Sequence, residues 1–374
     1  MKTTKYWAIA ASILLLALSV YGITEITTEQ PQTTSAEPAQ AEPLLITTAR
    51  EIDEFGDVIL EAKDIDLSYG DSLTVSFSGG HIEEAIAFYP DFFGNKGDTI
   101  LCDYYDHLCI GGINCEFNKT AHINHGEEVT ITLDERGKYL DLFNAFNIGS
   151  GEDRWPGQTE EQFINARSLS GGTMKEGIVY RSTSPFYREK KAGVAKYLEE
   201  HNIRFILDFA DSPEDIKTYE DLPEYTQEIV DSGNIVPAKY GIDYTDHNTK
   251  DTIGMAIKNL LDHEGPYLIQ CNLGRDRTGI VSSLLEALCG ATYDEIVSDY
   301  MLSYYNLYQA DMDPSSLQYS VFRQKLNDVL TEMYGLEAKE LPEADLELCA
   351  RAYLKTCGLS DEELDALRNR LEGK

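Results

Sequence analysis

Hydrophobic residues alternate with polar ones through the first folded part of the chain, residues 45–148. Glycines and asparagines that favour turns separate the alternating runs, as at residues 94–97 and 124–126. A period of two is typical of strands that bury one face. The alternating apolar positions are Leu73, Val75, Phe77, Val129, Ile131 and Leu133. We therefore predict a small antiparallel all-β domain over residues 45–148, a sandwich or barrel, in which no motif identifies a partner.

A different pattern begins at residue 149 and continues to residue 374. The apolar runs Phe205–Leu207 and Tyr267–Ile269 are continuous, as in strands buried on both faces. Apolar residues at helical spacing stand before and after the second run, namely Ile253, Ala256, Ile257, Leu260 and Leu261, then Ile280, Val281, Leu284, Leu285 and Leu288. This alternation of strands and helices predicts an α/β domain with a mostly parallel sheet flanked by helices.

The N-terminal segment has the pattern of an export signal. Lys2 and Lys5 are followed by an uncharged apolar stretch over residues 6–23, which is nearly long enough to anchor the protein in a membrane. Residues 24–44 are rich in Thr, Glu, Gln, Pro and Ala and are typical of a flexible linker. We expect residues 1–23 to be a signal peptide or membrane anchor. The protein would then be exported and lie outside the cell or on its surface.

The charge of the chain excludes one class of partner. The formal net charge of the 374 residues is −34 at pH 7. Such a field repels nucleic acids, so we expect no nucleic-acid partner. A phosphate group would have to be drawn in against the same field. Local positive charge at Arg181, Arg275 and Arg277 is therefore notable.

Residues 266–279 combine a predicted strand, a tight turn and the start of a helix around one cysteine. Cys271 ends the strand, Gly274 marks the turn, and Arg277 and Thr278 open the helix. The amides of such a turn and the positive end of the helix favour a bound anion and the thiolate form of the cysteine. The planar guanidinium of Arg277 can hold two phosphoryl oxygens, and the Thr278 hydroxyl can hydrogen-bond the sulfur. The segment thus predicts a phosphate cradle with a nucleophile at its base.

The Cys-x5-Arg-Thr spacing resembles the signature of the protein tyrosine phosphatase superfamily. Residues 274–279 are similar to the Gly-Lys-Asp-Arg-Thr-Gly loop of a bacterial branch that includes tyrosine, dual-specificity and phosphoinositide phosphatases. Further similar segments are Asn165–Gly172, Gly177–Ser182, Phe205–Asp208 followed by Glu214, and Leu359–Leu367. The resemblance covers about residues 150–374. It departs from the family at Gln270, where histidine is usual, at Ser168, where aspartate is usual, and at residues 209–210, where Leu-Arg is usual.

The resemblance implies a phosphatase that works through a cysteinyl-phosphate, with no metal and no cofactor. Cys271 would attack phosphorus, and Arg277 with the backbone amides of the loop would hold the phosphoryl oxygens. The loop residues expected to bind phosphate are Asn272, Leu273, Gly274, Arg275, Asp276 and Arg277. A general acid must protonate the leaving oxygen. Asp276 is the first candidate and Asp243 the second, while Asp208 is a third that could instead orient Arg277.

Three substrate interpretations follow from the same loop. Phosphotyrosine in proteins is the leading one. Arg275 beside Asp276 resembles loops that accept phosphoinositides or several phosphorylated residues. A phosphorylated small molecule or lipid headgroup is therefore the enzymatic alternative. A non-catalytic phosphate-binding module is a further alternative, prompted by Gln270 and by the missing arginine at position 210. Sulfur transfer, which also uses a loop cysteine, does not fit the helix opening at Arg277.

The chain contains seven cysteines. Cys271 must stay unpaired to act as a nucleophile, and the other six could pair in an oxidising compartment. Cys349 with Cys357 is one plausible pair, and Cys102, Cys109 and Cys115 are another source of pairs. The cysteine spacing does not match a zinc site.

Overall fold

The computed structural model describes residues 42–374 apart from 54, 95–96, 105–106, 114 and 187. The predicted signal peptide or anchor, residues 1–23, and most of the predicted linker lie outside the described residues. Among the helices of the described part, none is long and apolar enough to cross a membrane. The described residues contain two sheets.

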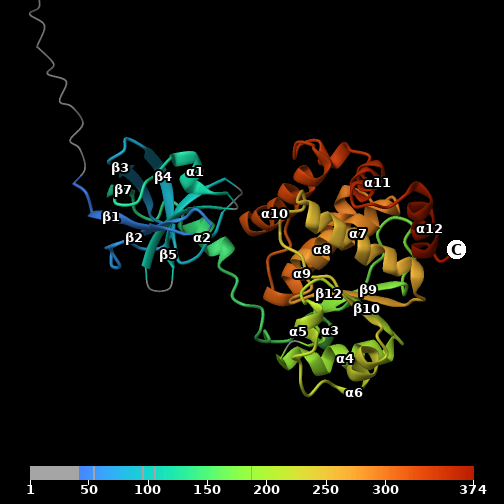
Figure 1. Ribbon diagram of the computed structural model, residues 1–374. Helices are drawn as coiled ribbons and strands as arrows, with labels where there is room; N and C mark the ends of the chain where they lie inside the picture. Colours follow the sequence, from blue (N-terminus) through green and yellow to red (C-terminus); the bar gives the residue numbers. More distant parts are fainter. Residues whose placement is uncertain (1–41, 54, 95–96, 105–106, 114, 187) are drawn as a thin grey trace, which may run out of the picture. The chain divides into compact units, whose positions relative to one another are not determined.

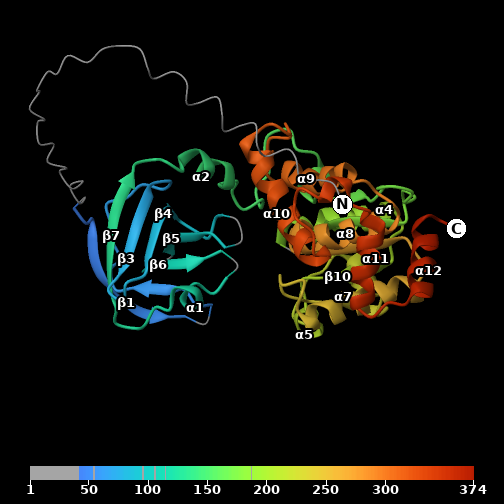
Figure 2. The ribbon, with the colours of Figure 1, turned by 90° about the horizontal axis from the view of Figure 1, so that it is seen from above.

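The first sheet is a closed barrel of seven strands, seen from above in Figure 2. The strands are β1 (Leu45–Ile52), β2 (Val58–Leu60), β3 (Ser72–Phe77), β4 (Ile82–Tyr89), β5 (Thr99–Tyr104), β6 (His107–Gly112) and β7 (Glu128–Glu135). They follow one another around the barrel in the order β1-β2-β6-β5-β4-β3-β7. The short helices α1 (Phe117–Ala121) and α2 (Leu140–Phe146) precede and follow β7.

One strand pairing of the barrel contradicts the predicted antiparallel sheet. β4 and β5 run parallel, with Ala87 opposite Ile100 and Tyr89 opposite Cys102. The other six pairings are antiparallel. Alternation shows which face of a strand is buried but not the direction of its neighbour. The turn residues at 94–97 were therefore compatible with either direction, and the prediction was wrong for this pair.

The alternating residues of the barrel strands fill its interior, as predicted. The side chains of Leu73, Val75, Val129 and Ile131 are fully buried, and that of Phe77 is nearly so. Removing one such side chain from water is worth about 1.5–3 kcal/mol. One-sided burial of β3 and β7 therefore stabilises the closed sheet.

The second sheet is mostly parallel and lies between helices, which confirms the predicted α/β fold. Its order is β11-β10-β12-β9-β8, and β8 alone pairs antiparallel in it. The strands are β8 (Arg167–Ser168), β9 (Val179–Thr183), β10 (Phe205–Asp208), β11 (Ile235–Pro237) and β12 (Tyr267–Cys271). The helices are α3 (Glu160–Phe163), α4 (Lys191–Glu200), α5 (Pro213–Ile216), α6 (Glu224–Asp231), α7 (His247–Asp262), α8 (Asp276–Leu288), α9 (Tyr293–Tyr308), α10 (Leu317–Tyr334), α11 (Leu346–Thr356) and α12 (Asp361–Leu371), with 3-10 turns at Arg188–Lys190 and Leu341–Glu343.

The central strands of this sheet bury both faces. Along β10, Phe205 and Leu207 belong to one hydrophobic cluster with residues of α7 and α8, whereas Ile206 belongs to another with residues of α4 and α6. Figure 1 shows α7, α8 and α11 on one side of β9, β10 and β12, and α4 to α6 on the other. Successive strand residues point to opposite faces, so a continuous apolar run fills both layers.

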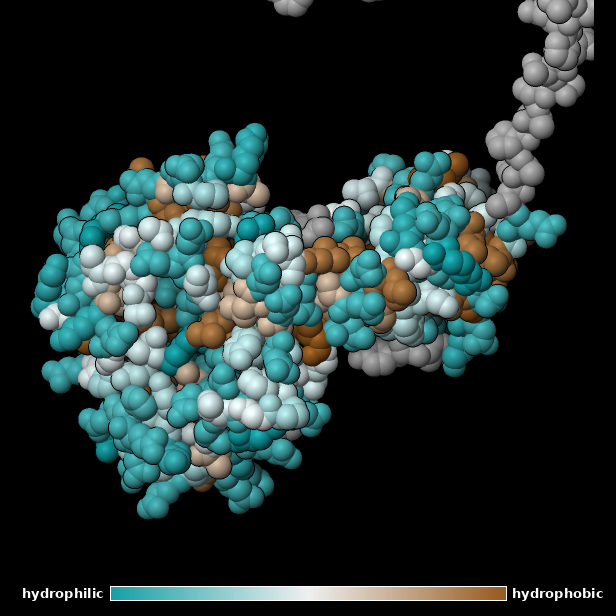
Figure 3. Space-filling model, turned by 180° about the vertical axis from the view of Figure 1, so that it is seen from behind, coloured by the Kyte–Doolittle hydropathy of each residue, from teal (hydrophilic) through white to brown (hydrophobic). Residues whose placement is uncertain are grey.

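The surface of the protein is largely hydrophilic. Figure 3 shows hydrophilic residues over most of the visible face, with smaller hydrophobic patches between them. The sequence holds 65 acidic residues against 31 lysines and arginines. A site for phosphate must therefore create its own local positive field.

Candidate active site

The predicted nucleophile lies where β12 ends, and α8 begins a few residues later. All five residues of β12 are buried, and Cys271 is 4% exposed. α8 starts at Asp276, so the amides of its first turn have no partner within the helix. Residues 271–277, which we call the nucleophile loop, thus join the cysteine directly to the positive end of α8.

The carbonyl groups of the nucleophile loop are held by neighbouring segments. The Leu273 and Gly274 carbonyls accept hydrogen bonds from Nδ2 of Asn165 at 3.1 and 3.0 Å. The Asn272 carbonyl accepts the amide of Ser184 at 3.1 Å. The C=O and N–H groups of a trans peptide unit point in opposite directions. The outward-held Asn272 and Gly274 carbonyls therefore turn the next two amides, those of residues 273 and 275, toward the interior of the loop, where they favour an anion. The Gly274 amide instead donates to the Cys271 carbonyl at 3.2 Å.

Gly274 is required by the shape of the nucleophile loop. Its φ angle is +61°, and a Cβ at this position would lie 2.0 Å from the Ser182 carbonyl oxygen. Glycine alone combines a positive φ with so close an approach of two backbone segments. The predicted turn at Gly274 is thus confirmed, together with its physical reason.

Arg277 reaches across to the end of the neighbouring strand. Its Nη1 donates a hydrogen bond to the Phe209 carbonyl at 2.6 Å. Phe209 directly follows β10, which pairs with β12. A guanidinium carries five N–H donors, so this bond leaves others for a phosphate. Thr278 is fully buried, and its hydroxyl has no hydrogen-bond partner among the described residues. The predicted bond from Thr278 to the sulfur is not made in this state.

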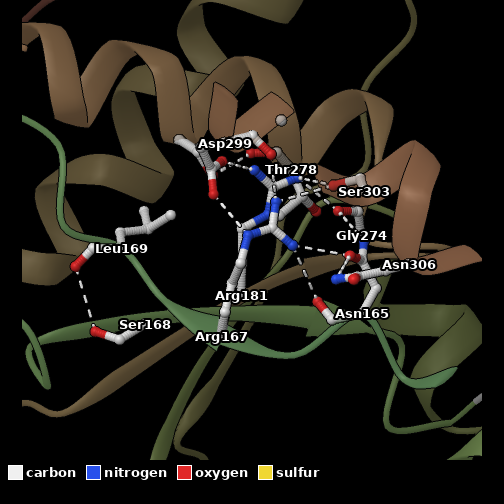
Figure 4. Close-up of polar contacts among 12 residues, drawn as sticks. Asn165, Arg167, Ser168, Leu169, Arg181, Gly274, Thr278, Asp299, Ser303 and Asn306 are labelled. Atoms are coloured by element: carbon white, nitrogen blue, oxygen red, sulfur yellow. Dashed lines mark hydrogen bonds and ion pairs between the residues drawn. The ribbon is translucent and has the colours of Figure 1, made fainter. Parts of the chain in front are cut away.

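A buried polar network supports the nucleophile loop from behind, as Figure 4 shows. Arg181 on β9 is fully buried and forms an ion pair with Asp299 of α9. Its Nη2 donates to the Gly274 carbonyl at 2.7 Å and to the Ser303 hydroxyl at 3.2 Å. Arg167 on β8 forms a second ion pair with Asp299 at 2.6 Å. Arg181, predicted as a supporting residue, therefore holds the loop by its backbone.

Two asparagines extend this network to the other loop carbonyls. Oδ1 of Asn165 accepts hydrogen bonds from Nη1 of Arg167 at 2.8 Å and from Nδ2 of Asn306 at 3.2 Å. The Nδ2 of Asn165 is thereby aimed at the nucleophile loop (Figure 4). The side-chain amides of both asparagines are thus held in one orientation. Asn165 in turn holds the loop backbone at two successive carbonyls, those of Leu273 and Gly274.

The charges of the network stabilise one another. Burial alone would raise the pKa of Asp299, but Arg167 and Arg181 outweigh it and lower the pKa of this carboxyl. Burial and the charge of Arg167 lower the pKa of Arg181, while Asp299 opposes them. An arginine nevertheless remains protonated in a protein. The network thus holds two cations and one anion almost entirely out of water.

Arg275 and Asp276 form a close pair beside the loop. Nε and Nη2 of Arg275 donate to the two carboxylate oxygens of Asp276 at 2.9 and 2.8 Å. Nη1 of Arg275 donates to the Tyr308 hydroxyl at 2.6 Å, and the guanidinium lies 5.1 Å from the Tyr304 ring centre. Burial opposes ionisation of Asp276, but Arg275 outweighs it and lowers the pKa of the carboxyl. Asp276 is therefore a carboxylate in this state.

The other two candidate proton donors lie in contrasting places. Asp243 is exposed, and its Oδ1 accepts the amide and hydroxyl of Thr245, each at 2.8 Å. Asp208 is fully buried at the end of β10, where its Oδ1 accepts the amides of Ala210 and Asp211 at 2.8 and 3.2 Å. Asp208 thus holds the turn that follows its own strand, and this turn carries the Arg277 contact.

Gln270 departs from the family pattern and is itself unusual. It is fully buried next to Cys271, and both polar atoms of its side-chain amide lack a hydrogen-bond partner among the described residues. It lies opposite Asp208 across the β10–β12 pairing.

Two other buried cysteines, Cys289 and Cys357, are not placed as nucleophiles. Burial raises the pKa of Cys289 to about 12 and that of Cys357 to about 11, which makes both thiols inert near neutral pH. Cys349 lies within α11 and Cys357 at its C-terminal end. Eight residues of helix separate their backbones by about 12 Å, too far for a disulfide. The pairing of these two cysteines suggested by the sequence is therefore wrong. No group of His, Cys, Asp or Glu in the described part could hold a metal.

A comparison with known protein families identifies the family to which the chain belongs. The model of a tyrosine phosphatase family matches residues 161–373, which is more than half of the chain. The chain belongs to the tyrosine phosphatase family. The matched residues contain the nucleophile loop and its supporting network. The comparison with curated proteins gives no significant match.

Solved structures that resemble the chain do so weakly. An uncharacterized conserved protein from Thermotoga maritima is 18% identical, with a TM-score of 0.22. The match covers 24% of this chain and 38% of the Thermotoga protein. The core catalytic domain of the PP-IP phosphatase SIW14 from S. cerevisiae is 16% identical over 41% of this chain and 86% of its own, with a TM-score of 0.26. TpbA of P. aeruginosa is 16% identical over 58% of this chain and 97% of its own, with a TM-score of 0.25. The match thus spans little more than a third of the Thermotoga protein, and TM-scores this low support no argument.

Three residues of the supporting network were not foreseen from the sequence. They are Asp299, Ser303 and Asn306, all on α9. Their spacing of four and three residues places them on one side of the helix. This polar stripe beside the apolar residues of α9 was the available signal for a buried polar contact.

Proposed function

We propose that this protein is a cysteine-dependent phosphatase and that it hydrolyses phosphotyrosine in proteins. The observation that carries the proposal is the position of Cys271 at the base of a loop whose carbonyls are held outward by Asn165 and Ser184. Inward amides and the nearby Arg277 favour a phosphoryl group at that point. A thiol at the base of such a cradle is aligned with phosphorus.

The proposed reaction has two displacements. The Cys271 thiolate attacks phosphorus, a sulfur–phosphorus bond forms, and the bond to the tyrosine oxygen breaks as that oxygen takes a proton. Water then attacks the same phosphorus, loses a proton to a base, and expels the thiolate. Arg277 and the loop amides hold the three equatorial oxygens in both steps.

Asp276 is proposed as the residue that gives and takes these protons. Without substrate it is bound to Arg275, which keeps it ionised. A phosphoryl dianion attracts Arg275 and so weakens that pair. The pKa of Asp276 then rises and the carboxyl can carry a proton. Asp243 is the alternative donor, because it lies on the segment that follows β11 and is exposed.

The substrate preference rests on aromatic side chains near the loop. Tyr240 and Tyr308 lie close enough to Cys271 for its charge to act on their hydroxyl groups. Tyr308 is partly exposed, so its ring can contact the ring of a phosphotyrosine. The enzymatic alternative is a phosphoinositide or a dual-specificity substrate, which Arg275 favours if a second phosphate displaces Asp276. A non-catalytic phosphate-binding module is the remaining alternative, because of Gln270.

Turnover by the full chain tests the proposal. A phosphotyrosine peptide, the matching phosphothreonine peptide and a phosphoinositide are each incubated with the wild type, with Cys271→Ser and with Cys349→Ser. Cys349 is a partly buried cysteine outside the loop and serves as the matched control. We expect phosphotyrosine to be hydrolysed fastest, by the wild type and Cys349→Ser alone. Faster hydrolysis of the lipid would favour the alternative. Equal, negligible rates for wild type and Cys271→Ser would leave a binding module.

Export is proposed from the N-terminal pattern alone. Residues 6–23 would direct the chain out of the cytoplasm as a signal peptide or an anchor. Fractionation of cells that express the full chain, with a variant carrying Leu15→Arg and Leu16→Arg as control, measures this. Wild-type protein found in the cytoplasm at the level of the variant would contradict export.

A further inference from the structure

The turn after β10 fixes the position of Arg277. Residues 208–211, which we call the anchoring turn, contain the carbonyl of Phe209 that accepts Nη1 of Arg277 at 2.6 Å. The turn is closed by Oδ1 of Asp208, which accepts the amides of Ala210 and Asp211. The placement of the guanidinium therefore depends on one buried carboxyl group that does not contact Arg277 directly.

Two carboxyl groups meet within the anchoring turn. Asp208 is fully buried and Asp211 is 6% exposed, and the Asp211 amide donates to Oδ1 of Asp208, which holds both carboxyl groups in one turn. Two ionised carboxylates buried in one turn would repel each other, which favours a carboxylic acid at one of them. Oδ1 of Asp208 already accepts the turn amides, and Oδ1 of Asp211 accepts the Tyr219 hydroxyl at 2.9 Å.

The remaining oxygens of the pair fit this assignment. Oδ2 of Asp208 and Oδ2 of Asp211 are both buried and have no donor among the described residues. They are the atoms left to share a proton. Gln270, which lies opposite Asp208 on β12, is neutral and brings no charge to the pair.

We propose that Asp208 and Asp211 share one proton and that this pair positions Arg277 through the carbonyl of Phe209. Asp208 is thus a positioning residue. Its effect on turnover rests on the proposed phosphatase function, whereas the shared proton does not. The chemical class of the ligand affected is a phosphate monoester or inorganic phosphate.

The proposal gives a direction for pH dependence. Burial and then the charge of Asp211 raise the pKa of Asp208 well above its ordinary value. The other charged or titratable groups around the pair are Tyr219, Arg277, and Asp215 with its partner Lys239. The pair keeps its proton at low pH and loses it as pH rises. Two buried carboxylates then repel each other, the turn loosens, and Arg277 loses its anchor.

Three substitutions separate this role from a purely structural one. Asp208→Asn keeps an oxygen for the turn amides and donates its NH₂ group to Asp211, but has no proton to lose. Asp208→Ala removes the acceptor of both amides. Glu220→Gln changes an exposed carboxylate beside Tyr219 and serves as the control.

Binding of inorganic phosphate to the full chain is measured by calorimetry near neutral pH and about two pH units above it. The ionisation of phosphate itself is the same with every variant. Differences in phosphate affinity between the proteins therefore come from the Asp208–Asp211 pair. We expect Asp208→Asn and the control to match the wild type near neutral pH, and Asp208→Ala to bind about tenfold more weakly. At the higher pH the wild type should fall about tenfold below Asp208→Asn. Equal pH dependence for wild type and Asp208→Asn would overturn the positioning role.

A measurement that needs no activity tests the proton itself. Carboxyl carbon NMR of aspartate-labelled protein should show one carboxyl that titrates well above the ordinary range of aspartates in the wild type and is absent in Asp208→Asn. If every aspartate titrates within that ordinary range, the shared proton is refuted even when turnover is normal. Absent turnover with a normal shared proton would instead count against the phosphatase function.

Discussion

Removal of the Asp299 carboxylate should destabilise the protein strongly, because it leaves two arginines without their partner. The Asp299 side chain is 13% exposed, against 0% for Arg181 and 12% for Arg167. Breaking a buried pair by removing one partner costs about 3–5 kcal/mol, since the remaining charge is left without compensation. Asp299→Ala should therefore lower the free energy of unfolding by about this amount.

Urea unfolding followed by tryptophan fluorescence suits this prediction. Trp155 donates its indole N–H to the Asn306 carbonyl at 3.0 Å, and Asn306 belongs to the same network. Its emission therefore reports the part of the chain that contains Asp299. The chain has two tryptophans, so Trp7 is replaced by phenylalanine in every protein compared.

A matched exposed pair provides the control. Arg204 and Glu228 lie 3.7 Å apart, with side chains 58% and 56% exposed. Glu228→Ala should change the free energy of unfolding by less than about 1 kcal/mol, because water screens such pairs. If Asp299→Ala costs no more than this control, the buried network does not hold the nucleophile loop by charge. The argument for Arg181 as a supporting residue would then fail.

Three further predictions concern glycine contacts and one buried carboxyl. Gly274→Ala should abolish phosphate binding in calorimetry, because its Cβ would lie 2.0 Å from the Ser182 carbonyl oxygen at a positive φ; wild-type affinity would contradict this. Gly254→Ala within α7 should lower the midpoint of thermal unfolding, although alanine usually stabilises a helix by about 1 kcal/mol. The reason is a Cβ placed 1.8 Å from the Cys357 carbonyl oxygen, and a raised midpoint would refute it. Burial raises the pKa of Asp57 from 3.8 to about 6, so the stability that this proton contributes is complete below 3.8 and lost as pH rises through 6. Asp57→Asn should flatten that part of the stability–pH curve, measured by circular dichroism, and an unchanged curve would count against the shift.

The sequence identified the nucleophile loop because its chemistry is local. Cys271, Gly274, Arg277 and Thr278 lie within eight consecutive positions, and strand, turn and helix each have short-range signals. The supporting network is not local, since Arg181 and Asp299 are 118 residues apart in the chain. No short-range pattern joins two such residues, and only the packing of α9 against the sheet brings them together.

The barrel illustrates a second limit of the sequence. The alternating sequence pattern predicted which residues of β3 and β7 point into the barrel and which point outward, because successive side chains of a strand point to opposite faces. The parallel pairing of β4 with β5 did not, because the pattern is the same for either direction. The same limit applies to Asp208 and Asp211, whose contact depends on how a turn closes after β10.

The charges around the nucleophile loop indicate that different arginines determine the affinity for phosphate and the preference among substrates. Arg181 is paired with Asp299, and Arg275 with Asp276, whereas the hydrogen bond from Arg277 goes to a neutral carbonyl. The attraction of a phosphoryl dianion to Arg277 and the loop amides is therefore not reduced by a competing carboxylate in that contact. The dianion can use Arg275 only by competing with a carboxylate that holds it by two hydrogen bonds. Affinity for any phosphate monoester should thus depend on Arg277, while Arg275 should respond most to substrates with a second negative group.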